Sequence, residues 1–185
     1  MKIIVHLPLL VLLGNRFITV VAATAQKCFA DGDELKAAFD EYIDNGCNDD
    51  KTNGSCSVVS ETYGHPMNSW CVGNVTNMIF LFSRKEGFNE DISSWDVSSV
   101  KSMSSMFSGA SSFNGDLSSW NTSSVEDMFD MFSGATSFNG NISSWNTSNV
   151  QDIDQIFGWR SAGATHPINC FYYMLISSLV WVLLH

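Results

Sequence analysis

The sequence predicts an α/β repeat solenoid, in which each repeat unit contributes one short strand and one short helix. The segment 93–100 returns at 118–125 and again at 143–150, at a constant spacing. Four columns of apolar residues keep the same period: Trp70, Trp95, Trp120 and Trp145; Val75, Val100, Val125 and Val150; Met78, Met103, Met128 and Ile153; Phe82, Phe107, Phe132 and Phe157. This phasing indicates that each unit buries its apolar side by stacking on its neighbours.

The repeat region is expected to span residues 63–162 as four units, of which the first is degenerate and the last is truncated. Within a unit, residues 91–95 predict a short strand that is followed by a turn. The next apolar residues lie three and four positions apart, which predicts one short helix that ends at Gly109.

The segment 1–25 has the pattern of a secretory signal peptide. Lys2 precedes an apolar run through Leu13, and the small residues 23–25 form a cleavage pattern. Asn15 and Arg16 interrupt the apolar run, which leaves a signal anchor as the alternative. We therefore expect the chain to enter the secretory pathway and to be extracellular or displayed on the cell surface.

Residues 26–62 are expected to form a cysteine-containing helical cap on the repeats. Residues 33–43 place their apolar side chains on one helical stripe. Four cysteines precede the regular repeats, namely Cys28, Cys47, Cys56 and Cys71. Four cysteines in a secreted segment suggest two disulfides, for which three pairings can be drawn. No metal site is expected, because no Cys-x-x-Cys spacing occurs and the histidines do not cluster.

Residues 163–185 form a hydrophobic C-terminal tail that contains the fifth cysteine, Cys170. The apolar stretch 168–184 lies at the short limit for crossing a bilayer, and no Lys or Arg follows it. The small residues 161–163 would suit the attachment of a GPI anchor, although the polar spacer after them is short. The tail is thus either a GPI signal or a membrane helix.

The charge and the distribution of reactive residues exclude some functions. A formal net charge of −10 makes nucleic acid an unexpected partner. The many Ser and Asp residues recur with the period, and the four histidines lie outside the regular coils. A clustered catalytic site is not expected on this pattern, and we predict a protein that is not an enzyme and has no cofactor.

Candidate binding residues lie along one face of the predicted strands. They are Asp91, Ser93, Trp95, Asp116, Ser118, Trp120, Ser143 and Trp145. The tryptophans are either buried pillars of the core or an exposed ladder that stacks on sugars or on partner side chains. Five sequons are candidate glycosylation sites, at Asn53, Asn74, Asn121, Asn141 and Asn146. A further column, Asn89, Asn114 and Asn139, is expected to hydrogen-bond the backbone of the next coil.

The unit at residues 113–135 has the sequence FNGDLSSWNTSSVEDMFDMFSGA. It resembles the 25-residue, Mycoplasma-lipoprotein-like repeat of the BspA-type leucine-rich-repeat surface proteins, and the resemblance covers residues 70–157. This family resemblance implies a leucine-rich-repeat-like right-handed coil, membrane anchorage and a role in adhesion. We therefore expect a non-catalytic surface protein that binds an extracellular protein or glycan. The alternative is a structural surface or matrix component without a specific ligand.

Overall fold

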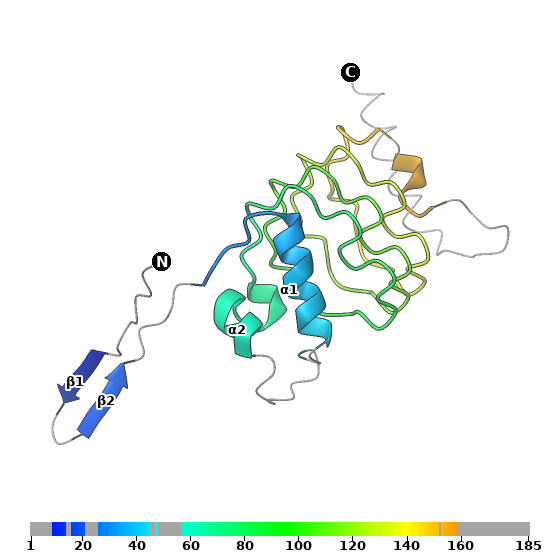
Figure 1. Cartoon of the computed structure of the whole chain (residues 1–185). Coiled ribbons are helices and arrows are strands. Elements are labelled where there is room, and N and C mark those ends of the chain that lie inside the picture. The colour runs from blue at the N-terminus through cyan, green and yellow to red at the C-terminus, as the bar shows by residue number, and fades with distance from the viewer. Residues whose placement is uncertain are drawn as a thin grey trace.

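The computed structural model describes residues 9–13, 16–20, 26–44, 47, 57–151 and 153–158. From residue 64 onward, the described chain winds into a stack of irregular coils, one for each repeat unit (Figure 1). The regular elements are strands β1 (Leu9–Leu13) and β2 (Arg16–Val20), helices α1 (Gly32–Asp44) and α2 (Ser57–Tyr63), and the 3₁₀ turns η2 (Met67–Ser69) and η3 (Ile153–Gln155).

The predicted α/β solenoid, with a strand and a helix in each unit, is wrong. Within the described residues of the repeat region, the chain contains no strand and, beyond the end of α2, no α-helix. Neighbouring coils meet instead at isolated parallel bridges, Asn77–Ser102 and Ser102–Asp127. The same observation corrects the expectation from the family resemblance, which implied a leucine-rich-repeat-like coil of strand plus helix.

A local hydrogen bond explains why residues 91–95 do not form a strand. The Ser93 N–H donates to Asp91 Oδ1 at 2.9 Å, which closes an Asx turn. The turn bends the chain within this short segment, so the segment cannot present an extended edge to the next coil.

The predicted helix after Val100 fails for a related reason. Ser105 has a φ of 54°, in the left-handed region, which interrupts any right-handed helix. Consecutive tight turns replace the helix, since the N–H groups of Met106 and Ser108 donate to the carbonyls three residues earlier. The apolar spacing of three and four therefore arises from turns.

Backbone hydrogen bonds between coils hold the stack together. The N–H groups of Met78, Phe80, Phe82 and Arg84 donate to the carbonyl oxygens of Ser102, Ser104, Met106 and Ser108, at distances of 2.7 to 3.1 Å. The next pair of coils repeats this pattern from Met103 to Gly109. Each coil thus satisfies its backbone groups on its neighbour, as the strands of a sheet would.

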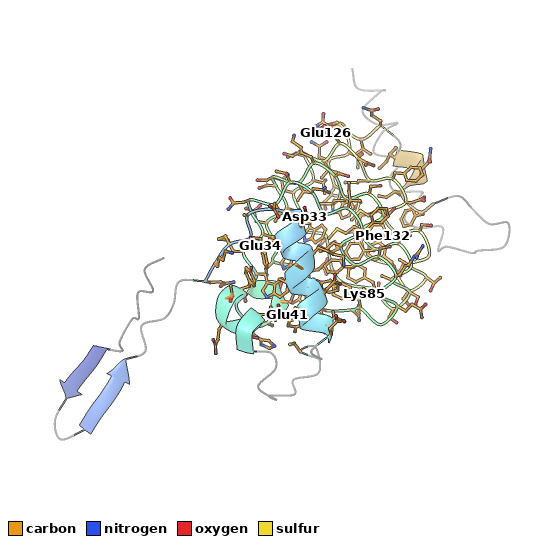
Figure 2. All side chains as sticks on the ribbon, viewed as in Figure 1. Asp33, Glu34, Glu41, Lys85, Glu126 and Phe132 are labelled. Carbon is orange, nitrogen blue, oxygen red and sulfur yellow. A yellow bond between two sulfur atoms is a disulfide. The ribbon has the colours of Figure 1, made fainter. Side chains whose placement is uncertain are left out.

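The apolar columns form the core of the stack. Phe107 lies between Phe82 and Phe132, with ring centroids 5.2 and 5.4 Å away. The methionines at 103, 106, 128 and 131 are fully buried, as their spacing with the phenylalanines predicted. Phe132 lies inside the stack, whereas Glu126 and Glu41 lie on its outside (Figure 2).

Helix α1 packs over the first coil and confirms the predicted helical stripe. Its buried residues are Leu35, Ala38, Phe39 and Tyr42. The Phe39 ring packs edge-on against Phe82, with ring centroids 4.8 Å apart, and the Tyr42 ring packs against Trp70 with centroids 5.6 Å apart. Gly32 permits this approach, because a Cβ at this position would clash with the carbonyl oxygen of Asn77.

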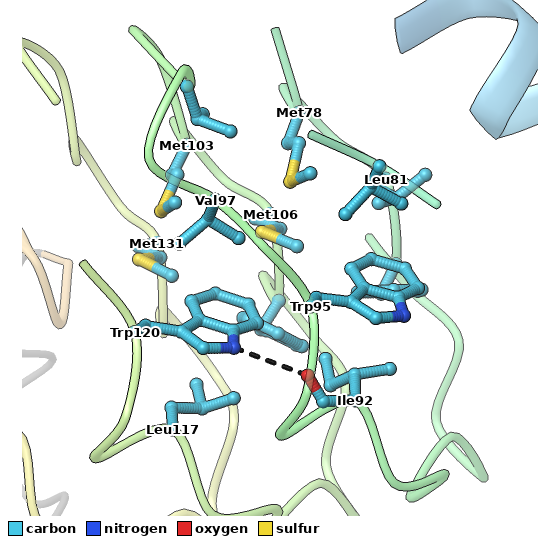
Figure 3. Packing of buried hydrophobic residues seen from close by; sticks show 14 of the residues in the cluster. Met78, Leu81, Ile92, Trp95, Val97, Met103, Met106, Leu117, Trp120 and Met131 are labelled. Atoms are coloured by element: carbon cyan, nitrogen blue, oxygen red, sulfur yellow. Dashed lines mark hydrogen bonds between the residues drawn. The ribbon is translucent and has the colours of Figure 1, made fainter. Parts of the chain in front are cut away.

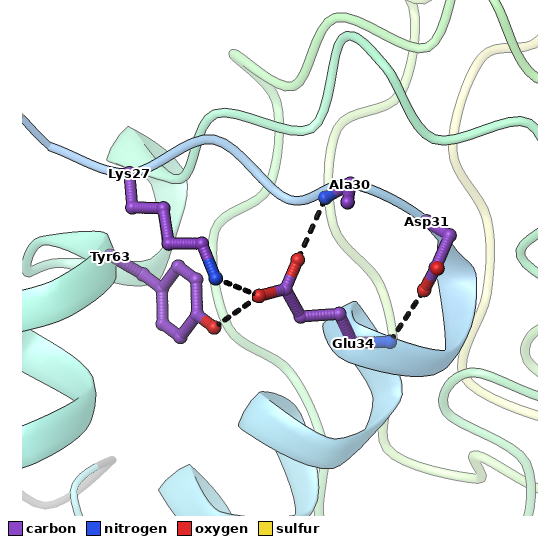
Figure 4. Close-up of polar contacts among 5 residues, drawn as sticks. All are labelled: Lys27, Ala30, Asp31, Glu34 and Tyr63. Carbon is purple, nitrogen blue, oxygen red and sulfur yellow. Dashed lines mark hydrogen bonds and ion pairs between the residues drawn. The ribbon is translucent and has the colours of Figure 1, made fainter. Parts of the chain in front are cut away.

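A polar cluster fixes the start of α1 (Figure 4). Asp31 Oδ1 accepts a hydrogen bond from the Glu34 N–H at 2.9 Å and caps the helix. The Glu34 carboxylate in turn accepts from the Ala30 N–H, the Lys27 ammonium and the Tyr63 hydroxyl. These bonds, that from Ala30 first, lower the pKa of Glu34 to about 2.

A disulfide between Cys28 and Cys71 joins the segment before α1 to the first coil. Next to it, the Phe29 N–H donates to the carbonyl oxygen of Cys71 at 3.0 Å. Cys47 is also disulfide-bonded, while Cys56 and Cys170 lie outside the described residues.

The stretch expected to be a signal peptide contains the hairpin of β1 and β2. Its antiparallel register pairs Leu9 with Val20 and Leu13 with Arg16. Within the ranges that the structure describes, no helix has the length and apolar character needed to cross a membrane. The hydrophobic tail at 163–185 lies outside those ranges.

Candidate binding surface

The tryptophan columns are buried pillars of the core. Trp95 and Trp120 are 3% exposed and Trp145 is 7% exposed, so the interpretation as an exposed aromatic ladder is wrong. That interpretation assumed the alternating side-chain directions of a strand, and no strand forms in these described coils. The three tryptophans among the candidate binding residues therefore offer no face to a ligand.

The polar candidates lie on the surface in matching positions of successive coils. Asp91, Asp116 and Ser143 are exposed, while Ser93 and Ser118 are partly buried. Together with Asn141, which the sequence indicated only as a glycosylation candidate, these residues form what we name the polar face: Asp91, Ser93, Asp116, Ser118, Asn141 and Ser143.

Asx turns give the polar face the same local geometry in every coil. The N–H groups of Ser93, Ser118 and Ser143 donate to the Oδ1 atoms of Asp91, Asp116 and Asn141 at 2.9, 2.9 and 3.0 Å. The hydrogen bonds from Ser118 also lower the pKa of Asp116. These turns were not predicted, although an Asx residue two positions before a serine is their signal.

The Asp91 carboxylate is bonded to another coil, unlike that of Asp116. Asp91 Oδ2 accepts a hydrogen bond from Asn68 Nδ2 at 2.9 Å, and the Asn68 side chain also contacts Ser94. Asp116 is bonded to Ser118 in its own turn. The hydrogen bonds described for Asp116 thus stay within its own coil.

The asparagine column is structural, as predicted. Asn89 Oδ1 accepts from the Asn114 N–H at 2.8 Å, and Asn114 Oδ1 accepts from the Asn139 N–H at 2.9 Å. Each side chain thus satisfies a backbone donor of the following coil.

Four of the five candidate glycosylation sites lie on the surface. Asn74, Asn121, Asn141 and Asn146 are at least partly exposed, and Asn53 is outside the described residues. Asn121 and Asn146 occupy the same position in adjacent coils, where Thr122 Oγ1 donates to the carbonyl oxygen of Asn146 at 3.1 Å.

One surface feature was not predicted from the sequence. Ile79, Phe80 and Phe129 are large apolar residues that remain exposed, by 38%, 56% and 36%. Phe80 lies off the apolar columns, and the equivalent positions in the next two units hold Ser105 and Asp130. The sequence contained one signal for this exposed apolar surface: an aromatic residue stands at a position that is polar in the next two units.

A metal centre does not emerge from the described part of the chain, where no three His, Cys, Asp or Glu side chains are grouped closely enough to hold an ion. The lysines there form ion pairs. Lys27 pairs with Glu34, Lys36 and Lys85 pair with Asp40, and Lys101 pairs with Glu126.

Comparison with known protein families gives a match, whereas searches of curated proteins and of solved structures give none. The matching family is DUF285, described as "Mycoplasma protein of unknown function", and its model covers residues 54–169. That range includes every coil described above and more than half of the chain. The chain therefore belongs to the DUF285 family.

Proposed function

We propose that this protein is a secreted or surface-anchored recognition module that binds an extracellular protein or glycan through the polar face, without catalysis. The observation that carries the proposal is the recurrence of one Asx turn in three successive coils, at Asp91, Asp116 and Asn141. The turns fix carboxylate, amide and hydroxyl groups in a row before any ligand arrives. Fixed groups lose little conformational freedom on binding, which favours affinity.

The chemistry of the row fits a partner rich in hydroxyl or amide groups. Hydrogen-bonded chains lie about 5 Å apart, so the row repeats on the scale of the sugar units of a glycan or the residues of a peptide. Attachment through the C-terminal tail, as a membrane helix or a GPI anchor, belongs to the same proposal. The resemblance to BspA-type surface proteins supports an adhesive role, although the solenoid fold that it implied is not part of the proposal.

The test uses the mature chain, secreted from cells, on a glycan array and on immobilised extracellular matrix proteins. The informative variant is Asp116→Ala, which removes the carboxylate. Asp116→Asn and Asp116→Ser are unsuitable, because they would create the sequons Asn-Leu-Ser and Asn-Gly-Ser. Glu86→Gln is the matched control, since it removes an exposed charge elsewhere on the stack.

We expect saturable binding that Asp116→Ala weakens by about tenfold, as for loss of one important polar contact, while Glu86→Gln binds like wild type. Equal binding by both variants would remove the polar face from the proposal. The absence of saturable binding to any probe would favour the alternative, a structural component without a specific ligand. Turnover that depends on one clustered site would contradict the non-catalytic proposal.

A further inference from the structure

Exposed apolar side chains lie in the first and the third of three neighbouring coils. We name Ile79, Phe80 and Phe129 the apolar band. The Phe80 N–H donates to the carbonyl oxygen of Ser104 at 3.1 Å, and Ser104 Oγ donates to the carbonyl oxygen of Phe129 at 3.1 Å. The small side chain of Ser104 therefore lies between the larger members of the band.

Phe80 has an unfavourable backbone conformation without gaining burial. Its φ is 57°, and the equivalent Ser105 and Asp130 each have a φ of 54°. The repeat thus requires a left-handed residue at this position, which small polar residues tolerate better than bulky ones. Phe80 is nevertheless aromatic and 56% exposed. Such a residue, strained and not packed, indicates a role outside the fold.

Hydrogen bonds fix the backbone beneath the band. Asn77 Oδ1 accepts from the Ile79 N–H at 3.0 Å, and Asp127 Oδ1 accepts from the Phe129 N–H at 2.9 Å. These Asx turns fix the backbone from which the exposed side chains at 79 and 129 project. Little backbone ordering would therefore be needed when a partner binds there.

A cation outside the described ion pairs lies in the same coil as Ile79 and Phe80. Arg84 is exposed, four residues after Phe80, and it is bonded through its N–H to the same neighbouring coil. Unlike the lysines at 27, 36, 85 and 101, it forms no ion pair with any side chain that the structure describes. In a chain with a formal net charge of −10, this position is unusual in attracting rather than repelling a carboxylate.

We propose that the apolar band and Arg84 form a docking surface for a segment of a partner protein that carries apolar side chains next to a carboxylate. The apolar side chains would cover Phe80 and its neighbours, and the carboxylate would pair with the Arg84 guanidinium. This surface is separate from the polar face, and it does not depend on the function proposed for that face.

The test measures binding of two fluorescent synthetic peptide pools to the purified full chain by anisotropy. One pool combines Leu and Phe with Asp and Glu, and the matched pool has Lys in place of each acidic residue. The variants are Phe80→Ser and Arg84→Gly. Each introduces the residue that the next unit has at the same position, Ser105 or Gly109, so each is compatible with the coil.

We expect the acidic pool to bind, and Phe80→Ser to weaken binding by about tenfold or more, as for a hot-spot residue. Arg84→Gly should weaken it by several-fold and reduce its dependence on salt. Lys101→Gln, which removes a cation already paired with Glu126, serves as the control and should bind like wild type. Failure of the acidic pool to bind, equal binding of both pools, or insensitivity to Phe80→Ser would overturn the proposal. So would dimerisation of the wild type that Phe80→Ser abolishes in sedimentation velocity, because the band would then bind a second copy.

Discussion

The indole Nε1 of Trp120 donates a hydrogen bond to the carbonyl oxygen of Ile92, in the preceding coil, at 3.2 Å (Figure 3). Trp95 bonds Met67 at 3.0 Å and Trp145 bonds Leu117 at 2.9 Å in the same way. Each tryptophan thus fills the core of its own coil and satisfies a buried carbonyl of the preceding one. A large apolar side chain with a single N–H donor meets both needs, which explains the strict tryptophan period.

Trp120→Phe should therefore destabilise the fold more than its small loss of side-chain volume suggests. Phenylalanine retains most of the apolar surface but removes the indole donor, while the Ile92 carbonyl still accepts from the Trp95 N–H at 3.2 Å. We expect the free energy of unfolding to fall by about 0.5–1.5 kcal/mol, the range for loss of one hydrogen bond. Urea denaturation measures this loss. Ser119→Ala, which removes an exposed bond to the Ser93 carbonyl, is the control, and an equal loss in both variants would contradict the assignment.

The asparagine column predicts that two substitutions of Asn114 lower stability by different amounts. Asn114→Ala removes the acceptor for the Asn139 N–H, and should lower the free energy of unfolding by about 0.5–1.5 kcal/mol. Asn114→Asp keeps an acceptor oxygen and should retain most of the stability. Amide hydrogen exchange gives a local measure, because the Asn139 amide should exchange faster in the alanine variant alone. Unchanged protection of that amide would show that the side chain does not bond the next coil in solution.

Glu34 predicts how stability depends on acid. Its folded-state pKa is about 2, below its ordinary value of 4.5, because Ala30, Lys27 and Tyr63 donate to the carboxylate. A lowered pKa stabilises the folded state above the unfolded pKa, and this contribution is lost as the pH falls through the folded pKa. We expect stability to decline between about pH 5 and pH 2. Glu34→Gln should flatten this decline in a series of denaturation curves, and an identical pH profile for both proteins would refute the role of Glu34.

The sequence predicted the period, the buried columns and helix α1, because these depend on apolar spacing that the chain itself records. It did not predict the local backbone correctly. Ser105 is left-handed because its N–H must reach the Phe129 carbonyl in the next coil, at 2.8 Å, and no local pattern encodes that bond. The direction of Trp95 was left open for the same reason, since strand parity applies only where a strand exists.

The candidate surface was predicted in part. The repeated Asp and Ser positions were identified, but the Asx turns that orient them were not, and Phe80 was missed because it does not keep the period. Surface residues that break the period indicate function and not packing. In the core a break would cost packing, whereas on the surface it changes what the stack presents to a partner.

Arg84 and Gly109 provide a matched pair for measuring the strain of the left-handed position. Arg84 has a φ of 60°, and Gly109, its equivalent one coil later, has a φ of 75°. Arg84→Gly should raise the free energy of unfolding by about 0.5–1 kcal/mol, because the relief of steric strain exceeds the added freedom of the unfolded chain. Gly109→Ala should lower it by about 1–2 kcal/mol. A Cβ at Gly109 would lie 3.5 Å from the Arg84 Cα, an ordinary contact, so backbone strain alone accounts for that loss. Thermal unfolding of both variants checks the signs, and a destabilised Arg84→Gly would mean that the arginine side chain contributes more by packing on the coil than its backbone costs.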